Sequence, residues 1–373
     1  MIYADNAATT KLDADAFEAM KPWLMDEYGN ASQPYSFSRK PRAALAEARS
    51  AIAECIHANP DEIFFTSGGT ESDNWALKGM VVRNDDHRAT ITTAFEHHAV
   101  LHACEAIERA GYPVAYIWPD IHGVISVEAL RSCITDATWL VSVMFANNEI
   151  GSIQPIRELC QLAHEHGAFF HTDAVQAVGH VPVDVKELGV DMLSASAHKF
   201  NGPKGIGFLY VKRGIDLPPF MDGGAQESGR RAGTENVASI VGMAAALRKN
   251  CEELKKNQAY ILELEEILLS ELRKQNLGFI RNGGADHIPG NLSLAFPGES
   301  GEKLLHRMDL MNICISTGSA CDSKNTQISH VLQAIGLDEK FAKGTIRISL
   351  GKSNTKEEMV AIAAALSKVV IKR

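Results

Sequence analysis

A lysine stands where a buried strand is expected to end, in the sequence SASAHK of residues 194–199, and the glycine-containing turn FNGPKG follows it directly. A lysine withdrawn from water at a strand end can lose its proton and form a Schiff base with a carbonyl compound. A single lysine is more often an ordinary surface residue. The combination of Ser196, His198 and Lys199 at one strand terminus favours a functional amine.

An aspartate closes the apolar sequence FFHTD of residues 169–173. A carboxylate at the end of a buried strand is costly unless it has a partner. Asp173 could keep the ring nitrogen of an aromatic cofactor protonated, which makes the ring an electron sink, or it could cap the start of a helix. Gln176, three residues later, could bind a ring oxygen or lie on a helix surface. The residues alone leave both alternatives open.

The sequence FTSGGTES of residues 65–72 passes from an expected strand into an expected helix. Glycines let the backbone approach a ligand closely, and the free amides and dipole of a helix start attract an anion such as phosphate. Gly69 and Thr70 are therefore candidate phosphate ligands. The signal is weak, because many strand-to-helix turns look similar. It is not a P-loop, since the Gly-Lys-Ser/Thr ending is missing.

His97 follows the expected strand Ala89–Ala94. Imidazole can stack on an aromatic ring and transfer protons near neutral pH, although a lone loop histidine is more often a satisfied polar residue. Because adjacent side chains point apart, His97 and His98 are poorly placed to share a metal ion. His164 and His166 have the same defect on a helix. We therefore expect no metal site.

Two further side chains could bind a carboxylate. Asn148 lies in the sequence NNEIG of residues 147–151, after an apolar strand, and Arg347 lies in the apolar sequence IRIS. The asparagine could bind a substrate carboxylate or a ring oxygen, or simply belong to a polar turn. A buried arginine usually has an anionic partner, and its fork suits a carboxylate. An arginine on an edge strand would instead face water.

Cys321 lies in the small, polar, glycine-containing sequence STGSACDSKN of residues 316–325, which predicts a mobile surface loop. An exposed thiol can ionise and attack, whereas a buried one is inert. Cys321 is thus a candidate nucleophile, with an incidental loop cysteine as the alternative.

The chain has seven cysteines and no Cys-x-x-Cys pair, which argues against a disulfide framework or zinc ribbon and favours a reducing, cytoplasmic compartment.

Short apolar strands and amphipathic helices alternate through the first 250 residues and must position these side chains. The expected strands are Glu62–Thr66, Ala89–Ala94, Trp139–Phe145, Ala168–Thr172, Asp191–Ala195 and Gly207–Val211. The expected helices are Ser36–His57, Glu71–Val82, Ala99–Ala110, Ile156–His166 and Val237–Lys249. The alternation predicts an α/β fold with a doubly wound, mainly parallel sheet, on which ligands bind at the carboxyl ends of the strands.

The apolar spacing of residues 239–276 is typical of one long helix or two. The last hundred residues combine strands near Leu292–Ala295 and Thr345–Ser349 with a terminal helix from Thr355, which predicts a smaller α+β unit. We expect a large domain over residues 12–250. A small domain, formed by residues 1–11 and 251–373, is expected to carry the cysteine loop.

The bulk composition excludes several classes of protein. The 373 residues are 45% hydrophobic and 22% charged, which is ordinary for a folded globular protein. A net charge of −9 argues against general nucleic-acid binding, which needs a basic surface. No apolar run reaches membrane-spanning length, and the N-terminal sequence MIYADNAATT lacks the basic and apolar regions of a secretory signal.

Together these residues resemble the cysteine desulfurases of the NifS/IscS type, in the class V aminotransferase group of fold-type I pyridoxal 5′-phosphate (PLP) enzymes. The matching sequences extend from ADNAATT at residues 4–10 to RISLG at residues 347–351, and they include TSGGTESDN, NNEIG, SAHKFNGPKG and RAGTEN. STGSAC at residues 316–321 is the most specific, and it is similar to the subgroup whose nucleophile lies on a longer loop. The sequence departs from the family pattern after Cys321 and rejoins it at His330.

The resemblance implies a fold-type I PLP-dependent transferase with a seven-stranded, mainly parallel sheet, assembled as a homodimer. It implies that Lys199 holds PLP, that Asp173 pairs with the ring nitrogen and Gln176 with the ring oxygen, and that His97 stacks on the ring and moves protons. Asn148 and Arg347 would bind the substrate carboxylate. The phosphate ligands would be Gly69, Thr70, Ser196, His198 and, from the neighbouring subunit, Thr234.

The implied reaction converts L-cysteine to L-alanine and leaves the sulfur as a persulfide on Cys321. A sulfur-acceptor protein, serving iron–sulfur cluster assembly or the thiolation of tRNA or another acceptor, would then take the sulfur. Two alternatives stay open. One is a selenocysteine lyase or another class V lyase or aminotransferase. The other is a partner-binding subunit that kept the fold but lost catalysis, and the joint presence of Lys199, Asp173, His97 and Cys321 argues against it.

Overall fold

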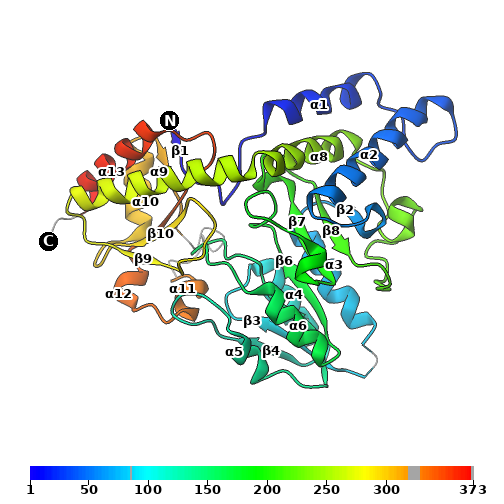
Figure 1. The fold of residues 1–373 in the computed structure, drawn as a ribbon, viewed down its shortest axis with the longest axis horizontal. Coiled ribbons are helices and arrows are strands. Elements are labelled where there is room, and N and C mark those ends of the chain that lie inside the picture. Colours follow the sequence, from blue (N-terminus) through cyan, green and yellow to red (C-terminus); the bar gives the residue numbers. More distant parts are fainter. Residues whose placement is uncertain (85, 318–327, 371–373) are drawn as a thin grey trace.

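The computed structural model describes residues 1–84, 86–317 and 328–370 (Figure 1). Its largest element is a seven-stranded sheet with the strand order β2-β8-β7-β6-β5-β3-β4. β8 runs antiparallel to its neighbours β2 and β7, and the other pairs are parallel. The predicted mainly parallel, seven-stranded sheet is confirmed. The strands are β2 (Ile63–Thr66), β3 (Ala89–Thr93), β4 (Val114–Ile117), β5 (Thr138–Ser142), β6 (Phe169–Asp173), β7 (Met192–Ser196) and β8 (Gly207–Val211).

The direction of β8 follows from the short chain that precedes it. Only residues 197–206 separate β7 from β8. A parallel connection needs a crossover of a dozen or more residues, whereas an antiparallel neighbour can be joined by a tight turn. The connection therefore stays at the edge of the sheet where β7 ends, and it carries Lys199.

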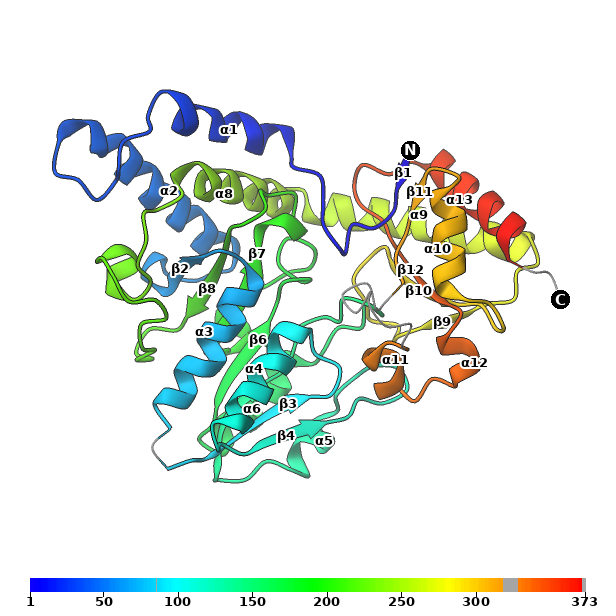
Figure 2. The same cartoon turned by 180° about the vertical axis from the view of Figure 1, so that it is seen from behind.

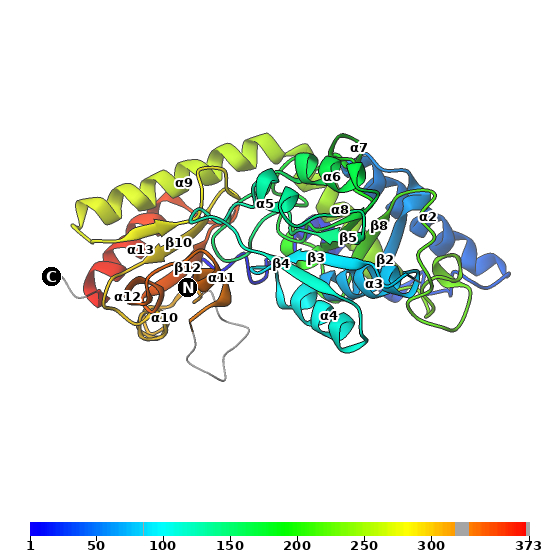
Figure 3. The same ribbon diagram turned by 90° about the horizontal axis from the view of Figure 1, so that it is seen from below.

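Side chains alternate between the two faces of this sheet, because successive residues of a strand point to opposite sides. Phe64 and Leu140 pack with α3 and α4 on one face. Phe65 and Val141 pack with α2, α6 and α8 on the other, as Figure 3 shows for the helix layers. Both faces are covered, which explains the nearly continuous apolar runs of the strands. These helices are α2 (Arg39–Cys55), α3 (Gly69–Val82), α4 (His98–Arg109), α6 (Ile156–Glu165) and α8 (Val237–Glu252).

Three of the differences from the prediction concern β4, α1 (Ala14–Met25) and β5. The prediction omits β4, a half-buried edge strand, and α1, which contains Pro22 and packs on α8 with much of its surface exposed. Because both elements are only partly buried, their apolar residues show no regular spacing in the sequence. The predicted strand Trp139–Phe145 ends too late, because the N–H of Met144 donates to the Glu96 carboxylate rather than to a neighbouring strand.

A second group of elements surrounds a three-stranded antiparallel sheet, β12-β10-β9. Its separate apolar core includes Leu268, Leu292 and Leu366. β1 joins it by pairing with β11, and Figure 2 shows α8 and α9 running in succession from the large sheet to this part. The division into two domains stays a prediction that these contacts favour. The elements are β1 (Ile2–Tyr3), α9 (Leu254–Lys274), β9 (Ile280–Asn282), β10 (Asn291–Ala295), α10 (Gly301–Asp309), β11 (Ile313–Cys314), α11 (His330–Ala334), α12 (Glu339–Ala342), β12 (Thr345–Ser349) and α13 (Lys356–Val369).

The large part also contains two shorter helices, α5 (Val127–Arg131) and α7 (Val185–Leu188). The predicted helical stretch of residues 239–276 is two helices, since the chain leaves helical geometry at Glu253. Within the described ranges, no helix combines the length and the apolar composition that crossing a membrane requires.

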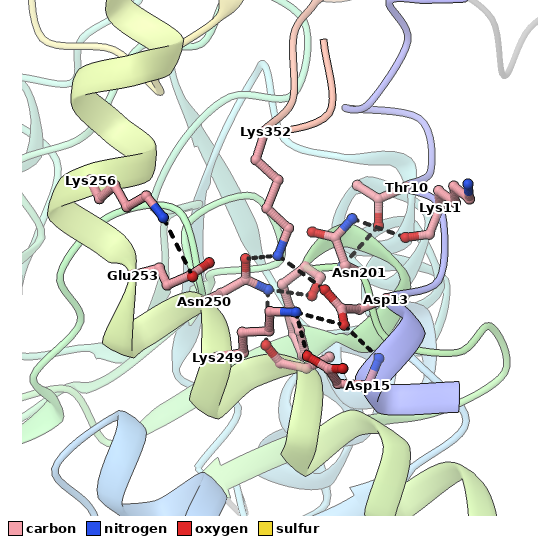
Figure 4. A network of polar contacts seen from close by, with 12 residues as sticks. Thr10, Lys11, Asp13, Asp15, Asn201, Lys249, Asn250, Glu253, Lys256 and Lys352 are labelled. Atoms are coloured by element: carbon pink, nitrogen blue, oxygen red, sulfur yellow. Dashed lines mark hydrogen bonds and ion pairs between the residues drawn. The ribbon is translucent and has the colours of Figure 1, made fainter. Parts of the chain in front are cut away.

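A polar network joins the N-terminal segment, the end of α8 and the segment after β12 (Figure 4). Lys249 donates to the carboxylate of Asp13 over 3.1 Å. Lys352 donates to the same carboxylate over 3.3 Å and to Oδ1 of Asn250 over 3.2 Å. The buried Asn250 in turn donates through Nδ2 to the carbonyl of Phe200 over 2.7 Å. The network therefore fixes the turn between β7 and β8.

We expect the substitution Asn250→Leu to lower the free energy of unfolding of the apoprotein by about 1–3 kcal/mol, because the buried Phe200 carbonyl loses its donor. Denaturant unfolding followed by circular dichroism measures this change. Lys256→Ala is the control, since Lys256 pairs with Glu253 at the surface with 79% of its side chain exposed. Such a pair contributes about 0–1 kcal/mol. Equal effects of the two variants would contradict the role given to Asn250.

Candidate active site

A cavity of about 550 Å³ opens at the carboxyl ends of the parallel strands, where an α/β sheet binds its ligands. The turns after β2, β3, β5, β6 and β7 line it, together with the N-terminal segment and β12. Sequence reasoning did not assign the wall formed by residues 7–9 to the site. The predicted site residues that line the cavity are Gly69, Thr70, His97, Asn148, Asp173, Gln176, Ser196, His198, Lys199 and Arg347.

Lys199 reaches the cavity from the connection between β7 and β8. Its Nζ donates to the carbonyls of Ala7 and Ala8 over 2.7 and 2.8 Å. Its own carbonyl accepts from Nε2 of His180 over 2.9 Å. The amine is therefore held between the N-terminal segment and the sheet edge. The run of small residues at positions 7–8 is the only sequence signal of this close approach.

The turn before α3 forms a tight cradle around the helix start. Gly68 has a φ of 149°, and a Cβ added at Gly69 would lie 2.6 Å from Cγ2 of Val175. A Cβ at Gly207 would lie 2.7 Å from the Cα of Gly68. Glycine is therefore required for the backbone packing here. The 14-residue helix α3 begins at this point and directs the positive end of its dipole toward the cradle.

Three polar side chains surround this cradle. Thr70 lies in the first turn of α3, and Ser196 is the last residue of β7. His198 shares a hydrogen bond between Nδ1 and the Thr9 hydroxyl over 3.1 Å. Burial, followed by the charge of Lys199, lowers the pKa of His198 to about 4. At neutral pH this imidazole is uncharged, and the anion site relies on hydrogen-bond donors and the helix dipole.

Asp173 ends β6 and is 5% exposed. Its Oδ1 accepts from the N–H of Val175 over 2.9 Å, so it caps the local turn while also lining the cavity. Burial raises the pKa of Asp173 to about 6, although the Val175 N–H and Lys199 favour the charged form. A cation bound beside it would favour ionisation further. Gln176 donates through Nε2 to the carbonyl of Ala7 over 3.1 Å.

His97 caps the start of α4. Its Nδ1 accepts from the N–H of Ala99 over 3.1 Å. Burial, followed by the charge of Lys199, lowers the pKa of His97 to about 4, so the ring is neutral at pH 7. Because Nδ1 is an acceptor, Nε2 carries the proton of this tautomer.

Arg347 is 4% exposed, which excludes an arginine that faces water from an edge strand. Its Nη2 pairs with Oδ1 of Asp5 over 2.7 Å, and its Nη1 donates to the backbone carbonyl of Asn148 over 3.0 Å. Its Nε is buried without a hydrogen-bond partner. The guanidinium therefore keeps donor capacity for a further acceptor. Sequence reasoning missed Asp5, whose only signal is its place in ADNAATT.

Two predicted site residues are not brought to this cavity within the described chain. Thr234 is exposed and does not line it. Cys321 lies outside the described residues. The chain on either side of residues 318–327 is fixed near the site, since Ser316 exchanges two backbone hydrogen bonds with Arg347. Ser329 donates to the Glu149 carboxylate over 2.5 Å.

The donor set fits PLP. An amine, a buried carboxylate and an anion cradle at a helix start face one cavity of suitable size. Gly69 packs closely against Val175, and the start of α3 lines the cavity. Across the described residues, no group of three His, Cys, Asp or Glu side chains could hold a metal ion.

Comparison with known proteins agrees with this geometry. Residues 2–362 match the family model described as aminotransferase class-V. The chain is 43% identical to "Cysteine desulfurase IscS" of Methanosarcina thermophila, over 100% of this chain and 92% of that protein. It is 44% identical to the protein of the same name from Dictyoglomus turgidum, over 100% and 95%. A solved "NIFS-LIKE PROTEIN" superposes with a TM-score of 0.94 at 36% identity, over 99% and 98% of the two chains.

Glu96, next to His97, is a buried acid that sequence reasoning missed. It is 0% exposed, and its Oε1 accepts from the Thr93 hydroxyl and the Met144 N–H, both over 2.8 Å. Its Oε2 is buried without a partner. Burial raises the pKa of Glu96 to about 8. A carboxyl with a raised pKa favours the folded state at low pH and loses this contribution as the pH rises to its folded pKa.

We therefore expect the free energy of unfolding of the apoprotein to fall as the pH rises from about 4.5 to 8. Glu96 alone should contribute a slope of up to about 1.4 kcal/mol per pH unit. Glu96→Gln should remove that component, as measured by denaturant unfolding across this pH range. Glu71→Gln is the control. Despite its burial, hydrogen bonds from Arg231 and Ser67 lower the pKa of Glu71, so its contribution is lost as pH falls. An unchanged slope in Glu96→Gln would rule out a protonated Glu96.

Proposed function

The chain belongs to the aminotransferase class-V family and is a cysteine desulfurase, and on this premise we propose how its own residues perform the reaction. The observation that carries the proposal is the convergence of the Lys199 amine, the Asp173 carboxylate and the Arg347 guanidinium on one cavity. These groups could respectively attach the cofactor, protonate its ring and orient an amino-acid carboxylate.

The family depends on PLP, which when bound acts as an electron sink for negative charge at the substrate α-carbon. Lys199 would attach the cofactor, and Asp173 would hold the ring nitrogen in its protonated form. His97 would stack on the ring, and Gln176 would bind the ring oxygen. The phosphate would be bound by Gly69, Thr70, Ser196, His198 and the Thr234 of a second subunit.

Arg347 would bind the carboxylate of L-cysteine. Asp5 and the Asn148 carbonyl hold two of its nitrogens at 2.7 and 3.0 Å, which leaves the fork oriented for a further acceptor. The Asn148 side chain would support the same carboxylate. A guanidinium held at two points loses less side-chain freedom when it binds, so the substrate is oriented at a lower entropic cost.

Two groups would move protons. Lys199, once released from the cofactor, would take the proton from the substrate α-carbon, because a desolvated amine can act as a base. Its carbonyl partners Ala7 and Ala8 keep Nζ at the cavity wall. His97 would donate from Nε2, the nitrogen that carries its proton while Nδ1 caps α4. The two roles are therefore assigned to different atoms.

Cys321 would receive the sulfur. Its thiolate attacks the substrate sulfur, so an S–S bond forms as the C–S bond breaks. The electron pair of that bond passes to the substrate β-carbon, which gains a proton and becomes the methyl group of L-alanine. The sulfur is oxidised and the carbon reduced by the same two electrons, and no external oxidant is needed. The product is a persulfide on Cys321.

We expect Cys321→Ala to lose alanine and persulfide formation from L-cysteine by at least 100-fold, as for loss of a catalytic nucleophile. It should keep the visible absorbance of bound PLP, because Lys199 and Asp173, which are proposed to hold the cofactor, are unchanged. Mass spectrometry for the persulfide and an alanine assay measure the loss. Cys133→Ala is the matched control, since Cys133 donates only to the Ala129 and Leu130 carbonyls. Full activity in Cys321→Ala would favour a lyase that needs no persulfide.

We further infer a homodimer. Phe17, Leu24 and Met25 of α1 are 45, 56 and 75% exposed, and Tyr28 beyond it is 72% exposed. Contiguous exposed apolar groups of this kind mark an association surface. Thr234 is also exposed and would complete the phosphate site of the other subunit.

Mixed dimers of Lys199→Ala and Thr234→Ala chains test this assignment. If Thr234 serves the other subunit, one site of the mixed dimer has both residues intact, and activity at limiting PLP should recover to roughly half of the wild-type value. If Thr234 serves its own chain, both sites are damaged and no recovery occurs. Each homodimer measured alone is the control. A monomer by sedimentation would contradict the homodimer directly.

The persulfide must be consumed by a thiol acceptor, since a sulfane sulfur is transferred by thiolate attack. An iron–sulfur scaffold and an enzyme of tRNA or other thiolation both fit this chemistry. The seven cysteines without a Cys-x-x-Cys pair favour a reducing compartment such as the cytoplasm. Persulfide-transfer assays against purified acceptors of both kinds distinguish the two pathways.

A further inference from the structure

A buried acid that the mechanism does not use lies in the floor of the cavity. Asp73, in α3, is 1% exposed and lines the same cavity as Asp173. Its Oδ1 is buried without a hydrogen-bond partner. Nε2 of His171 lies 3.7 Å from that oxygen, beyond hydrogen-bond distance. A buried carboxylate in such surroundings has lost its water without gaining a full set of donors.

The groups under Asp73 form a chain across three strands. His171 of β6 is 0% exposed, and its ring nitrogens contact the hydroxyls of Ser142 in β5 (2.9 Å) and Ser194 in β7 (3.0 Å). Ser194 also hydrogen-bonds Asp73. Burial lowers the pKa of His171 to about 3, so the imidazole is neutral. The chain thus offers Asp73 hydroxyl and imidazole dipoles, but no positive charge.

The charged groups that face Asp73 are themselves acidic. Asp173 of β6 disfavours its ionisation, and Glu96 after β3 would add to this effect at a pH where it ionises. Of the other elements packed on α3, α4 brings the buried Cys104, which faces Glu96, while its remaining titratable side chains are half-buried or exposed: His98, His102, Glu105, Glu108 and Arg109. β8 directs Tyr210 to the opposite face of the sheet. β2, β5 and β7 bring no titratable side chain.

Asp73 and Asp173 therefore compete for one proton. Two carboxylates that share a desolvated site cannot both ionise near neutral pH. Asp173 has the Val175 N–H and the charge of Lys199 in favour of its anion. Asp73 has a single neutral hydroxyl partner and is pushed well above the usual pKa of an aspartate by burial.

We propose that Asp73 is a positioning residue that holds a proton beneath the cofactor site, so that Asp173 alone faces the cofactor ring as an anion. The proposal rests on the function proposed above. By staying neutral, Asp73 keeps its contact with Ser194 without drawing charge from the pair formed by Asp173 and the ring nitrogen. The loss of this proton would place a second anion in the floor of the cavity.

Asp73→Asn tests the proposal, because it keeps the shape and neutrality of the protonated acid. The holoenzyme should keep its PLP affinity. The pH midpoint of the bound cofactor's visible spectrum should shift by less than about half a pH unit, because a neutral amide replaces a neutral acid. Asp173→Asn, which removes the anion itself, should shift the spectrum and weaken cofactor binding. A shift of a unit or more in Asp73→Asn would overturn the proposal.

An apoprotein measurement separates this idea from the function proposed above. At neutral pH, unfolding of the wild type should release one more proton than unfolding of Asp73→Asn, as calorimetry in buffers of different ionisation enthalpy reports. Equal proton release would mean that Asp73 is ionised in the fold. If neither the wild type nor Asp73→Asn bound PLP, the proposed function would be contradicted. The proton release on unfolding of the two apoproteins would still test whether Asp73 is protonated.

A second variant covers the case in which Asp73→Asn does not fold. In folded Glu96→Gln apoprotein at neutral pH, the infrared spectrum should retain a protonated-carboxyl band that shifts in deuterium oxide. The Glu96→Gln background is used because Glu96 is itself protonated at neutral pH and would contribute a band of the same kind. The absence of any such band would overturn the proposal.

Discussion

Charge balance among buried groups is the constraint on which this site depends. Ionic groups there interact strongly and are expensive to leave unpaired. Two cations of the cavity have fixed partners: the carbonyls of Ala7 and Ala8 hold Lys199, and Asp5 holds Arg347. The imidazoles of His97 and His198 are kept neutral by burial and by Lys199.

The N-terminal segment supplies much of this balance and also joins the two groups of elements. Asp5 contacts β12, and Thr10 donates to the carbonyl of His198 over 2.8 Å. Asp13 accepts from Lys249 and Lys352, at the end of α8 and after β12. The amine of Lys199 and the guanidinium of Arg347 are therefore positioned by one short segment. A shift of that segment would change both at once.

The described residues on either side of positions 318–327 contact the elements around the cavity. Ser316 pairs with the strand that carries Arg347, and Ser329 contacts Glu149, the residue after Asn148. His330 donates to the carbonyl of Glu96 over 2.9 Å, next to His97. The described residues on both sides of the segment that contains the proposed sulfur acceptor thus contact elements around the cavity.

The sequence by itself determined the sheet and the turn residues, because local apolar patterns report burial and because Gly69, Asp173 and Lys199 directly follow or end buried strands. It did not indicate β4 and α1, whose half-exposed surfaces carry no clear period. Nor did it indicate the pairing of Asp5 with Arg347, 342 positions apart, or the burial of Asp73 and Glu96. Only the tertiary structure decided these, because the ionisation and partners of a side chain depend on neighbours that the fold brings from distant parts of the chain.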